Sequence, residues 1–472
     1  MKFNVIKGPF FKSKNNTNKI MLNLLIALIP IILFSFYKNG IVLYQNNKTD
    51  IFGMFYPLIF ILTGVVSSFI IETIYAYLFL HLKKDKLKEY IKTSFSIFPG
   101  LFVSLVLPIN TPLEMVVLAS IIATVIGKMI YGGFGHNIFN PALIGCLFVL
   151  TAYSSVISLN GGYINKYELD TIGSVTPLTN SKIVENISYD SLVKPYGSLS
   201  DFFFGFIPGS TGETCSFLII IALIYLIIKK VIKWKIPIIY IGTVFIMTLI
   251  IGKINNLGIW YPIFSILSGG LLFGATFMAT DPVTSPVTSL GQVIYALMLG
   301  ILTVTFRYLT SAPEGVLTSI LTMNMFVPLL DRLGSSSKFA YKKSLLPLVI
   351  IFILTLGLSI NVGNKLKKNN DEDTNFKIIE KTNSYYIVTE KGNGGPIKAK
   401  ITINDSKITN IEILENNETE SYYKLIEEQN YINKLINNQE NIKDIDTVSG
   451  ATISSTALKR MVINVINDRW GK

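Results

Sequence analysis

Eleven apolar segments, each long enough to cross a lipid bilayer, occupy most of the first 363 residues of this chain. A membrane-spanning segment is helical because its backbone polar groups must be satisfied inside the hydrocarbon, and it needs about 20 mostly apolar residues to cross a core about 30 Å thick. Half of all residues are hydrophobic and only 15% are charged, which is far from the composition of a soluble domain. We therefore predict a polytopic α-helical membrane protein with about 10–11 transmembrane helices. The expected spans are 20–37, 55–81, 91–110, 113–133, 138–157, 214–230, 235–252, 258–280, 287–306, 314–330 and 343–363.

Residue usage argues against two classes of function. The net charge of +12 resides in short loops between apolar segments rather than in one basic patch, which argues against nucleic-acid binding. The two cysteines, Cys146 and Cys215, lie within apolar segments and lack the spacing of metal ligands. We expect neither a nucleic-acid partner nor a metal centre in this chain.

The basic residues also predict the orientation of the chain. They gather in four clusters, before the first span and after the second, sixth and tenth, and all four fall inside when the amino terminus is cytoplasmic. The loop 158–213 and everything after residue 363 are then extracytoplasmic. The clusters are Lys2–Lys19, Lys83–Lys92, Lys229–Lys235 and Arg332–Lys343.

The first ten spans are consistent with a duplicated five-helix unit. An odd number of helices per unit inserts the second copy upside down, which gives an inverted repeat. Asn140-Pro141-Ala142 and Asp281-Pro282-Val283 occupy comparable junctions between spans in the two halves. The repeat remains a hypothesis at this point.

Residues 364–472 change to a polar composition rich in Lys, Asn, Asp and Glu. Segments 384–389, 397–403 and 408–414 alternate as half-buried strands do, and helical patterns follow near 420–438 and 454–467. We predict a small extracytoplasmic α+β domain that is large enough to fold alone.

A threonine motif near the carboxyl terminus, D-T-V-S-G-A-T at 446–452, suits a hydroxyl presented on a tight turn for attachment of a bulky group. Gly450 and Ala451 keep the approach to Thr452 open. Hydroxyl and N–H groups at the start of the next helix could bind an attached phosphate. The structural alternative is an ordinary helix N-cap. The neighbours expected to contact an attached group are Asp446, Ser449, Gly450, Ala451 and Ser454.

A looser copy of this motif lies in the long outer loop. Asp170 precedes Thr176 by six positions, as Asp446 precedes Thr452, and Thr176 is followed by Pro177. The functional interpretation is a second modified threonine, and the structural one is a Thr-Pro turn in a flexible loop.

The glycine-rich turn Gly209-Ser210-Thr211-Gly212-Glu213-Thr214 opens the sixth span. Unpaired N–H groups at such a turn are a natural seat for an anion. Gly212, Glu213 and Thr214 could hold a phosphate or shape a ring pocket, whereas Glu213 could instead cap the helix. Both interpretations stay open.

Three polar residues lie inside or beside spans, where they are costly and often functional. Asn137, Asn140 and Asp281 could line a cofactor pocket or an ion path. The structural alternative is a cytoplasmic turn that Asp281 caps.

Together these segments resemble the RnfD/NqrB family of membrane subunits over residues 1–335. The specific parts are N-I-F-N-P-A at 137–142, the turn at 209–214, and F-M-A-T-D-P-V at 277–283. Residues 343–472 resemble the RnfG/NqrC type, in which one anchoring helix precedes an FMN-binding domain that carries D-x-x-S-G-A-T. The chain is thus expected to be a fusion with a transmembrane domain at 1–335, an anchoring helix and linker at 336–374, and an FMN-binding domain at 375–472.

The resemblance implies the cofactors. In that family FMN is joined through its phosphate to the last threonine of S-G-A-T, so it implies covalent FMN on Thr452 and a second FMN on Thr176. A noncovalent riboflavin among the spans is known in relatives and is compatible with this chain.

The resemblance also implies the function. The chain would be a flavin relay of an Rnf-type complex in the cytoplasmic (inner) membrane of a bacterium, an electron-transfer subunit rather than a complete enzyme. The complex would carry electrons between ferredoxin and NAD, coupled to Na⁺ or H⁺ transport. Partners would be the other subunits and a flavin transferase for maturation. No catalytic residue is assigned.

Three alternatives remain open. The first is a subunit similar to NqrB and NqrC in a Na⁺-pumping NADH:quinone oxidoreductase. The second is a secondary transporter or channel, which the repeat and the broken helices would fit. The third is a membrane anchor for a sensory flavodomain without ion transport.

Overall fold

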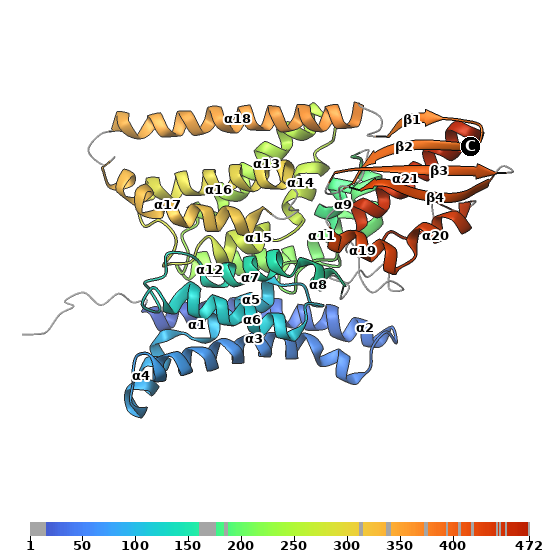
Figure 1. The fold of residues 1–472 in the computed structure, drawn as a ribbon. Coiled ribbons are helices and arrows are strands. Elements are labelled where there is room, and N and C mark those ends of the chain that lie inside the picture. The colour runs from blue at the N-terminus through green and yellow to red at the C-terminus, as the bar shows by residue number, and fades with distance from the viewer. Residues whose placement is uncertain are drawn as a thin grey trace, which may run out of the picture.

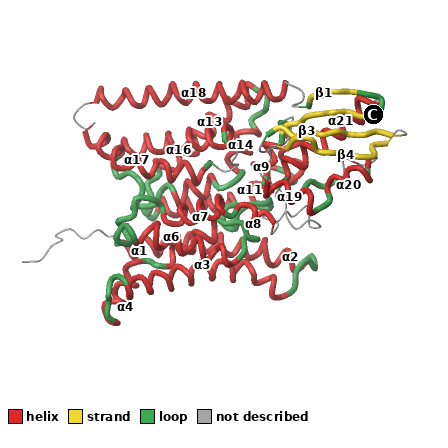
Figure 2. The backbone as a smooth tube through the Cα atoms, viewed as in Figure 1, coloured by secondary structure: helices red, strands yellow, loops and turns green. Residues whose placement is uncertain are grey.

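The computed structural model consists of a large helical region and a small sheet domain at one end of it (Figures 1 and 2). All statements below concern the residues that the structure describes. These are 16–159, 176–183, 187–310, 315–336, 341–371, 376–392, 395–404, 407–416, 420–439, 442, 445–448 and 451–470.

Helices occur in every segment predicted to span the bilayer. The first five spans correspond to α1 (Thr17–Phe36), α3 (Ile51–Leu78), α5 (Ile97–Val106), α6 (Leu113–Thr124) with the π-helix η2 (Val125–Met129), and α7 (Pro141–Ala152) with α8 (Ser154–Leu159). The remaining spans correspond to α12 (Ser216–Ile228), α13 (Lys235–Ile254), α14 (Trp260–Leu267) with α15 (Leu271–Phe273) and η4 (Gly274–Met278), α16 (Ser289–Leu309), α17 (Val316–Ser336) and α18 (Tyr341–Asp371).

Shorter elements connect these helices. They are η1 (Tyr37–Ile41), α2 (Val42–Gln45), α4 (Lys84–Ser94), α9 (Pro177–Ile183), α10 (Tyr189–Leu192), η3 (Lys194–Tyr196) and α11 (Leu199–Phe204).

The polytopic helical class is confirmed, but the number of full-length spans is smaller than the sequence predicts. Five described helices are long and apolar enough to cross a membrane, and the pair formed by α14 and α15–η4, bent by 65°, makes a sixth. Other predicted spans contain shorter helices: α5, α7 and α12 have only 10, 12 and 13 residues. Proline and glycine explain two of the breaks. Pro108 closely follows the end of α5, and Gly269, at φ +67°, follows the end of α14.

Helix packing follows the same order in the two halves of the membrane region. In the first half α3 packs against α5 and α6, and α6 packs against α7. In the second half α13 packs against α14 and α16, and α16 packs against α17. The opening helices of the halves, α1 and α12, pack against each other. This arrangement agrees with a duplicated five-helix unit, and α18 lies outside it against α13 and α16 (Figure 1).

The C-terminal domain is a four-stranded antiparallel sheet in the order β1-β2-β3-β4, accompanied by three helices. Tyr386 of β2 pairs with Ile401 of β3, and Val388 pairs with Ala399. These four side chains are buried and form the core with α19, α20 and α21, whereas the alternate residues of β3 are more exposed. The elements are β1 (Lys377–Lys381), β2 (Tyr385–Lys391), β3 (Pro396–Asn404), β4 (Lys407–Asn416), α19 (Glu420–Glu428), α20 (Tyr431–Asn437) and α21 (Thr452–Trp470).

The predicted strands correspond to β2, β3 and β4, but β1 is absent from the prediction because all five of its residues are exposed and show no alternation. The single helix expected at 420–438 is two helices, α19 and α20. They are separated where Asn430 adopts a left-handed conformation at φ +49°.

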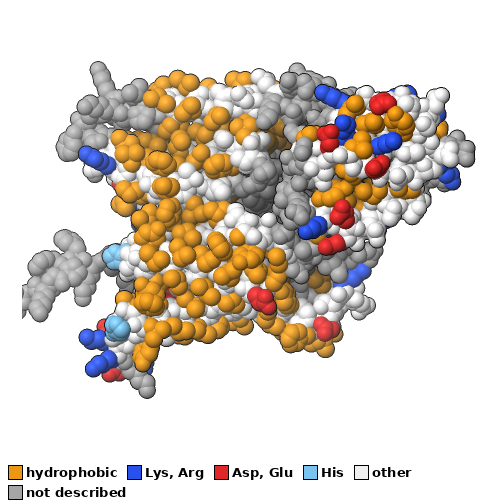
Figure 3. All heavy atoms as spheres, in the orientation of Figure 1, with side chains coloured by type: hydrophobic (Ala, Val, Ile, Leu, Met, Phe, Trp, Pro, Cys, Tyr) orange, Lys and Arg blue, Asp and Glu red, His pale blue; other side chains and the backbone are white. Residues whose placement is uncertain are grey.

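On the face shown in Figure 3 the helical region is mostly hydrophobic, and charged side chains gather at its ends and over the sheet domain. This distribution fits helices that face lipid. α9 and the sheet domain lie at the same end of the helical region, and α4 lies at the opposite end (Figure 1).

Candidate functional site

The C-terminal threonine motif leads directly into α21, which begins at Thr452. The Ala451 N–H donates to the Val448 carbonyl over 3.0 Å, and the Ser455 N–H donates to the Ala451 carbonyl over 2.9 Å. The Ser455 hydroxyl closes the turn by accepting from the Val448 N–H over 3.1 Å. Asp446 is exposed and Ala451 is buried, whereas Ser449 and Gly450 lie outside the described residues.

Two hydroxyl groups in this domain are buried without a hydrogen-bond partner among the described residues. One is the Ser454 hydroxyl, two residues after Thr452. The other belongs to Tyr431, whose pKa is raised by burial and by the nearby charge of Asp446. Buried hydroxyls are nearly always hydrogen-bonded, so these two suit a bound polar group that supplies the missing partners. The residues present therefore fit a flavin nucleotide at this motif.

Thr176 lies at the start of α9 and is half-buried. Its Oγ1 is 2.9 Å from the Thr179 Oγ1 and accepts from the Thr179 N–H over 3.2 Å. Asp170 lies outside the described residues. Thr176 lines a cavity of about 10 Å³ together with segment 207–214 and the helix break after α14. The structure thus brings Thr176 and the glycine-rich turn together.

The glycine-rich turn is held by the end of α5. The Thr211 N–H donates to the Leu107 carbonyl over 3.2 Å, and the Gly212 N–H donates to the Leu105 carbonyl over 2.7 Å. These two N–H groups are therefore engaged and do not form the open anion seat considered from the sequence. Glu213 and Thr214 instead line the cavity beside Thr176.

Glu213 precedes Cys215, the N-cap residue of α12, by two positions, and the Cys215 side chain accepts no capping hydrogen bond. The Glu213 carboxylate packs against Gly270 in the break after α14, where a β-carbon would lie 2.4 Å from the Glu213 Oε1. Any larger residue at position 270 would displace this carboxylate. The helix break after α14 therefore packs against the Glu213 carboxylate and restricts its position.

Asn137, Asn140 and Asp281 converge on a second cavity, of about 60 Å³, at a different place in the helical region. The Asn140 N–H donates to the Asn324 Oδ1 over 3.2 Å, and the Asn137 side-chain amide donates to the Phe139 carbonyl over 3.1 Å. Five phenylalanine rings contribute to the lining of this aromatic cavity: Phe95, Phe98, Phe102, Phe134 and Phe277.

Asp281 caps a turn and also lines this cavity, whose role as a cofactor pocket or ion path stays a prediction. Its carboxylate accepts from the Thr284 hydroxyl over 2.9 Å and from the Thr284 N–H over 3.3 Å, so it does cap the turn. It also lines the aromatic cavity. Lys128, which lines this cavity, and its partner Glu72 were not among the residues expected here, although charged residues within apolar segments are a signal of function. Asn324, which accepts from the Asn140 N–H, was not expected either.

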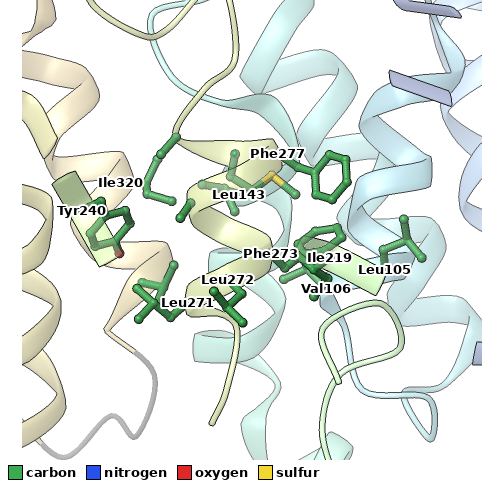
Figure 4. Packing of buried hydrophobic residues seen from close by; sticks show 14 of the residues in the cluster. Leu105, Val106, Leu143, Ile219, Tyr240, Leu271, Leu272, Phe273, Phe277 and Ile320 are labelled. Carbon is green, nitrogen blue, oxygen red and sulfur yellow. The ribbon is translucent and has the colours of Figure 1, made fainter. Parts of the chain in front are cut away.

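A middle cavity of about 50 Å³ lies between the other two. It shares Ser210 and Glu213 with the Thr176 cavity, and it is lined by Met278, next to Phe277 of the aromatic cavity. The Asn140 side-chain amide reaches the Met278 carbonyl over 3.5 Å. Val106, Leu143, Phe273 and Ile320 pack in this region (Figure 4). The three cavities therefore follow one another through the helical region.

Family models match two parts of the chain. Residues 4–340 match the model described as the NQR2, RnfD, RnfE family, and residues 392–467 match the FMN-binding domain.

Individual relatives agree with the first match. The chain is 34% identical over 346 residues to the D-type subunit of a proton-translocating ferredoxin:NAD(+) oxidoreductase complex from Clostridium ljungdahlii, covering 72% of this chain and 97% of the relative. It is 33% identical over 328 residues to the D-type subunit of the Na(+)-translocating complex from Acetobacterium woodii, covering 70% and 92%. A third relative is the B-type subunit of the Na(+)-translocating NADH-quinone reductase from Chromohalobacter salexigens, 35% identical over 253 residues, covering 51% and 59%.

Proposed function

Because the chain belongs to the NQR2, RnfD, RnfE family over residues 4–340, we propose that it is the flavin-carrying membrane subunit of an Rnf-type ion-translocating oxidoreductase. The complex would carry electrons between ferredoxin and NAD, coupled to the transport of Na⁺ or H⁺. The observation that carries this proposal is that nearly the whole of the Clostridium ljungdahlii relative aligns here, next to an FMN-binding domain in the same chain.

The proposed cofactors are two FMN groups, each joined through its phosphate to a threonine, at Thr452 and Thr176. The partnerless Ser454 and Tyr431 hydroxyls support the first site. The cavity beside Thr176 supports the second. Bound flavin supplies the redox chemistry, and the protein supplies its position and electrostatic surroundings.

The proposed orientation places both threonines outside the cytoplasmic membrane of a bacterium. It is supported by the position of α9 at the same end of the helical region as the sheet domain (Figure 1). The lysine-rich helix α4 lies at the opposite end, as the positive-inside rule requires for the cytoplasmic side.

The aromatic cavity is the place we propose for a noncovalent riboflavin. Its phenylalanine rings offer stacking surfaces, and Asn137, Asn140 and Asp281 offer polar contacts. The rings of Phe95 and Phe134, 4.9 Å apart between centroids, both line this cavity.

The proposed partners are the iron–sulfur and nicotinamide-binding subunits of the complex, together with a flavin transferase for maturation. Co-purification of the chain with such subunits would separate this function from that of a sensory anchor. A role in a Na⁺-pumping quinone reductase has less support, because the chain covers only 59% of the Chromohalobacter salexigens relative.

The test is peptide mass spectrometry of the full chain expressed with a flavin transferase. We expect the mass of FMN on the peptides that contain Thr176 and Thr452. Thr452→Ala should remove one modification and Thr176→Ala the other, whereas the neighbouring substitutions Thr447→Ala and Thr179→Ala should leave both. Flavin fluorescence that persists on a denaturing gel in the double Thr176/Thr452 variant would show that at least one covalent flavin is attached elsewhere, and a modification that persists in a single variant would refute that site. A parent chain without covalent flavin would leave only a transporter-like or scaffold role.

A further inference from the structure

Two buried cationic side chains flank the cavity beside Thr176. Lys38, in the π-helix η1, is 8% exposed and donates its ammonium to the Ile207 carbonyl. Ile207 itself lines the cavity. Arg307, near the end of α16, is 5% exposed and donates to the Ser265 carbonyl over 2.7 Å and the Ser268 carbonyl over 3.3 Å. The next residue, Gly269, lines the cavity from the other side.

Neither cation forms an ion pair with a carboxylate among the described residues. Both instead donate to backbone carbonyl groups, which are neutral. The Arg307 Nε–H and the Ser268 hydroxyl are also buried without a hydrogen-bond partner in the described part of the chain. Buried charges and donors are costly unless they are paired, so this arrangement is suited to an additional anion.

The charges around the cavity support the same conclusion. Among the described residues, Lys38 and Arg307 carry two positive charges, and Glu213, which lines the cavity, carries one negative charge. The sum over these three described residues is one positive charge. A phosphate that is esterified on both sides, to the flavin ribityl chain and to a threonine, carries one permanent negative charge.

We propose that Lys38 and Arg307 are positioning residues that hold the phosphodiester of the flavin attached to Thr176. This inference rests on the proposed attachment at Thr176. The two cations come from different halves of the membrane region, so the anion site forms only when the halves pack together. A β-carbon at Gly40, inside η1, would lie 2.2 Å from the Met54 carbonyl, so close packing on α3 fixes the segment that carries Lys38.

The test uses the two flavin sites of one chain as an internal reference. Lys38→Met and Arg307→Met remove the charge and keep an apolar side chain suited to membrane burial. Lys38→Arg and Arg307→Lys keep the charge. Lys253→Met is the matched control, because Lys253 is an exposed lysine in the last turn of α13. Each full chain is expressed with the flavin transferase, and the ratio of FMN on the Thr176 peptide to FMN on the Thr452 peptide is measured.

We expect the two methionine variants to lower this ratio at least tenfold. The charge-conserving variants and Lys253→Met should keep at least half of the parent ratio. Thermal unfolding in detergent like that of the parent shows that the helical region of a variant is folded, and full loading of Thr452 shows the same for the C-terminal domain. Parent-like loading of Thr176 in both methionine variants overturns the inference while leaving the proposed attachment intact. Equal loss in Lys38→Arg and Lys38→Met, or in Arg307→Lys and Arg307→Met, also overturns it, because shape rather than charge would then be required. A parent chain without FMN on Thr176 overturns both proposals.

Discussion

The Lys128 ammonium nitrogen lies 2.6 Å from the Glu72 Oε2, and both side chains are almost completely buried. The same nitrogen donates to the Ser94 carbonyl at the end of α4 over 2.6 Å. One cation thereby joins η2, α3 and α4 at the wall of the aromatic cavity. Removing one member of a buried pair leaves the other charge uncompensated, which costs more than removing both.

Lys128→Met should therefore destabilise the helical region by about 3–5 kcal/mol, because Glu72 would remain buried without its partner. The double variant Lys128→Met/Glu72→Met should recover most of this loss. Thermal unfolding in detergent measures both. Lys88→Met, at an exposed lysine of α4, is the control and should unfold like the parent. Equal destabilisation in the single and double variants would contradict the prediction.

Gly100→Ala should disrupt the crossing of α3 and α5. A β-carbon at Gly100 would lie 1.8 Å from the Gly64 carbonyl oxygen, so the helices must move apart, at a cost of about 1–3 kcal/mol. At Gly242 in α13 a β-carbon meets nothing within 4 Å, so Gly242→Ala should be neutral or slightly stabilising. Denaturation curves in the same detergent give the free energy of unfolding of each variant. Equal free energies of unfolding for Gly100→Ala and Gly242→Ala would show that α3 and α5 do not pack closely at Gly100.

Replacing Ser454 and replacing Ser455 should have different effects on the stability of the C-terminal domain. Ser455→Ala leaves the buried Val448 N–H without the hydroxyl that it binds, which should cost about 1–3 kcal/mol. Ser454→Ala removes a hydroxyl that has no hydrogen-bond partner among the described residues, so stability in a flavin-free Thr452→Ala background should not fall. Hydrogen exchange of the peptide spanning 445–458 measures the difference. A loss of protection in Ser454→Ala as large as that in Ser455→Ala would rule out the assigned contacts.

The stability of the C-terminal domain should depend on pH through Asp468. Hydrogen bonds from the Lys381 ammonium, over 2.6 Å, and from the Tyr386 hydroxyl, over 2.9 Å, hold the pKa of Asp468 below its ordinary value of about 3.9. The ionised carboxylate therefore stabilises the fold above that ordinary value. This stabilisation is lost as the pH falls through the lowered pKa.

Hydrogen exchange of β2 and α21 peptides, followed from neutral pH to about pH 2 across the ordinary aspartate pKa, should thus show less acid sensitivity in Asp468→Asn than in the parent. Glu412→Gln, at an exposed position of β4, is the control and should behave like the parent. An acid response of Asp468→Asn identical to that of the parent would exclude this carboxylate as the cause.

Local patterns were sufficient to predict much of the fold. Apolar length located a helix in each predicted span, and alternation located β2, β3 and β4. The motif ending in Thr452 was expected just before the last helix, and the structure begins α21 at that residue. The half-length of α5 was not predicted, although Pro108 just after it is a local stop signal. The edge strand β1 was not predicted because its residues lack any pattern of burial.

In the candidate sites, too, local patterns identified single residues but not the contacts between distant segments. The sequence marked Thr176, the turn at 209–214 and Asp281 by residue type, and their roles in flavin binding stay predictions. It did not reveal that Lys38 contacts Ile207, 169 residues away, or that Lys128 pairs with Glu72, 56 residues away.

The sequence by itself determined that this protein lies in a membrane and carries a separate polar domain, because hydrophobic length and strand alternation act over a few neighbouring residues. Only the tertiary structure decided which charges face which cavity. Those contacts join residues far apart in the sequence, and the free energy of a buried charge depends on the groups that surround it in space.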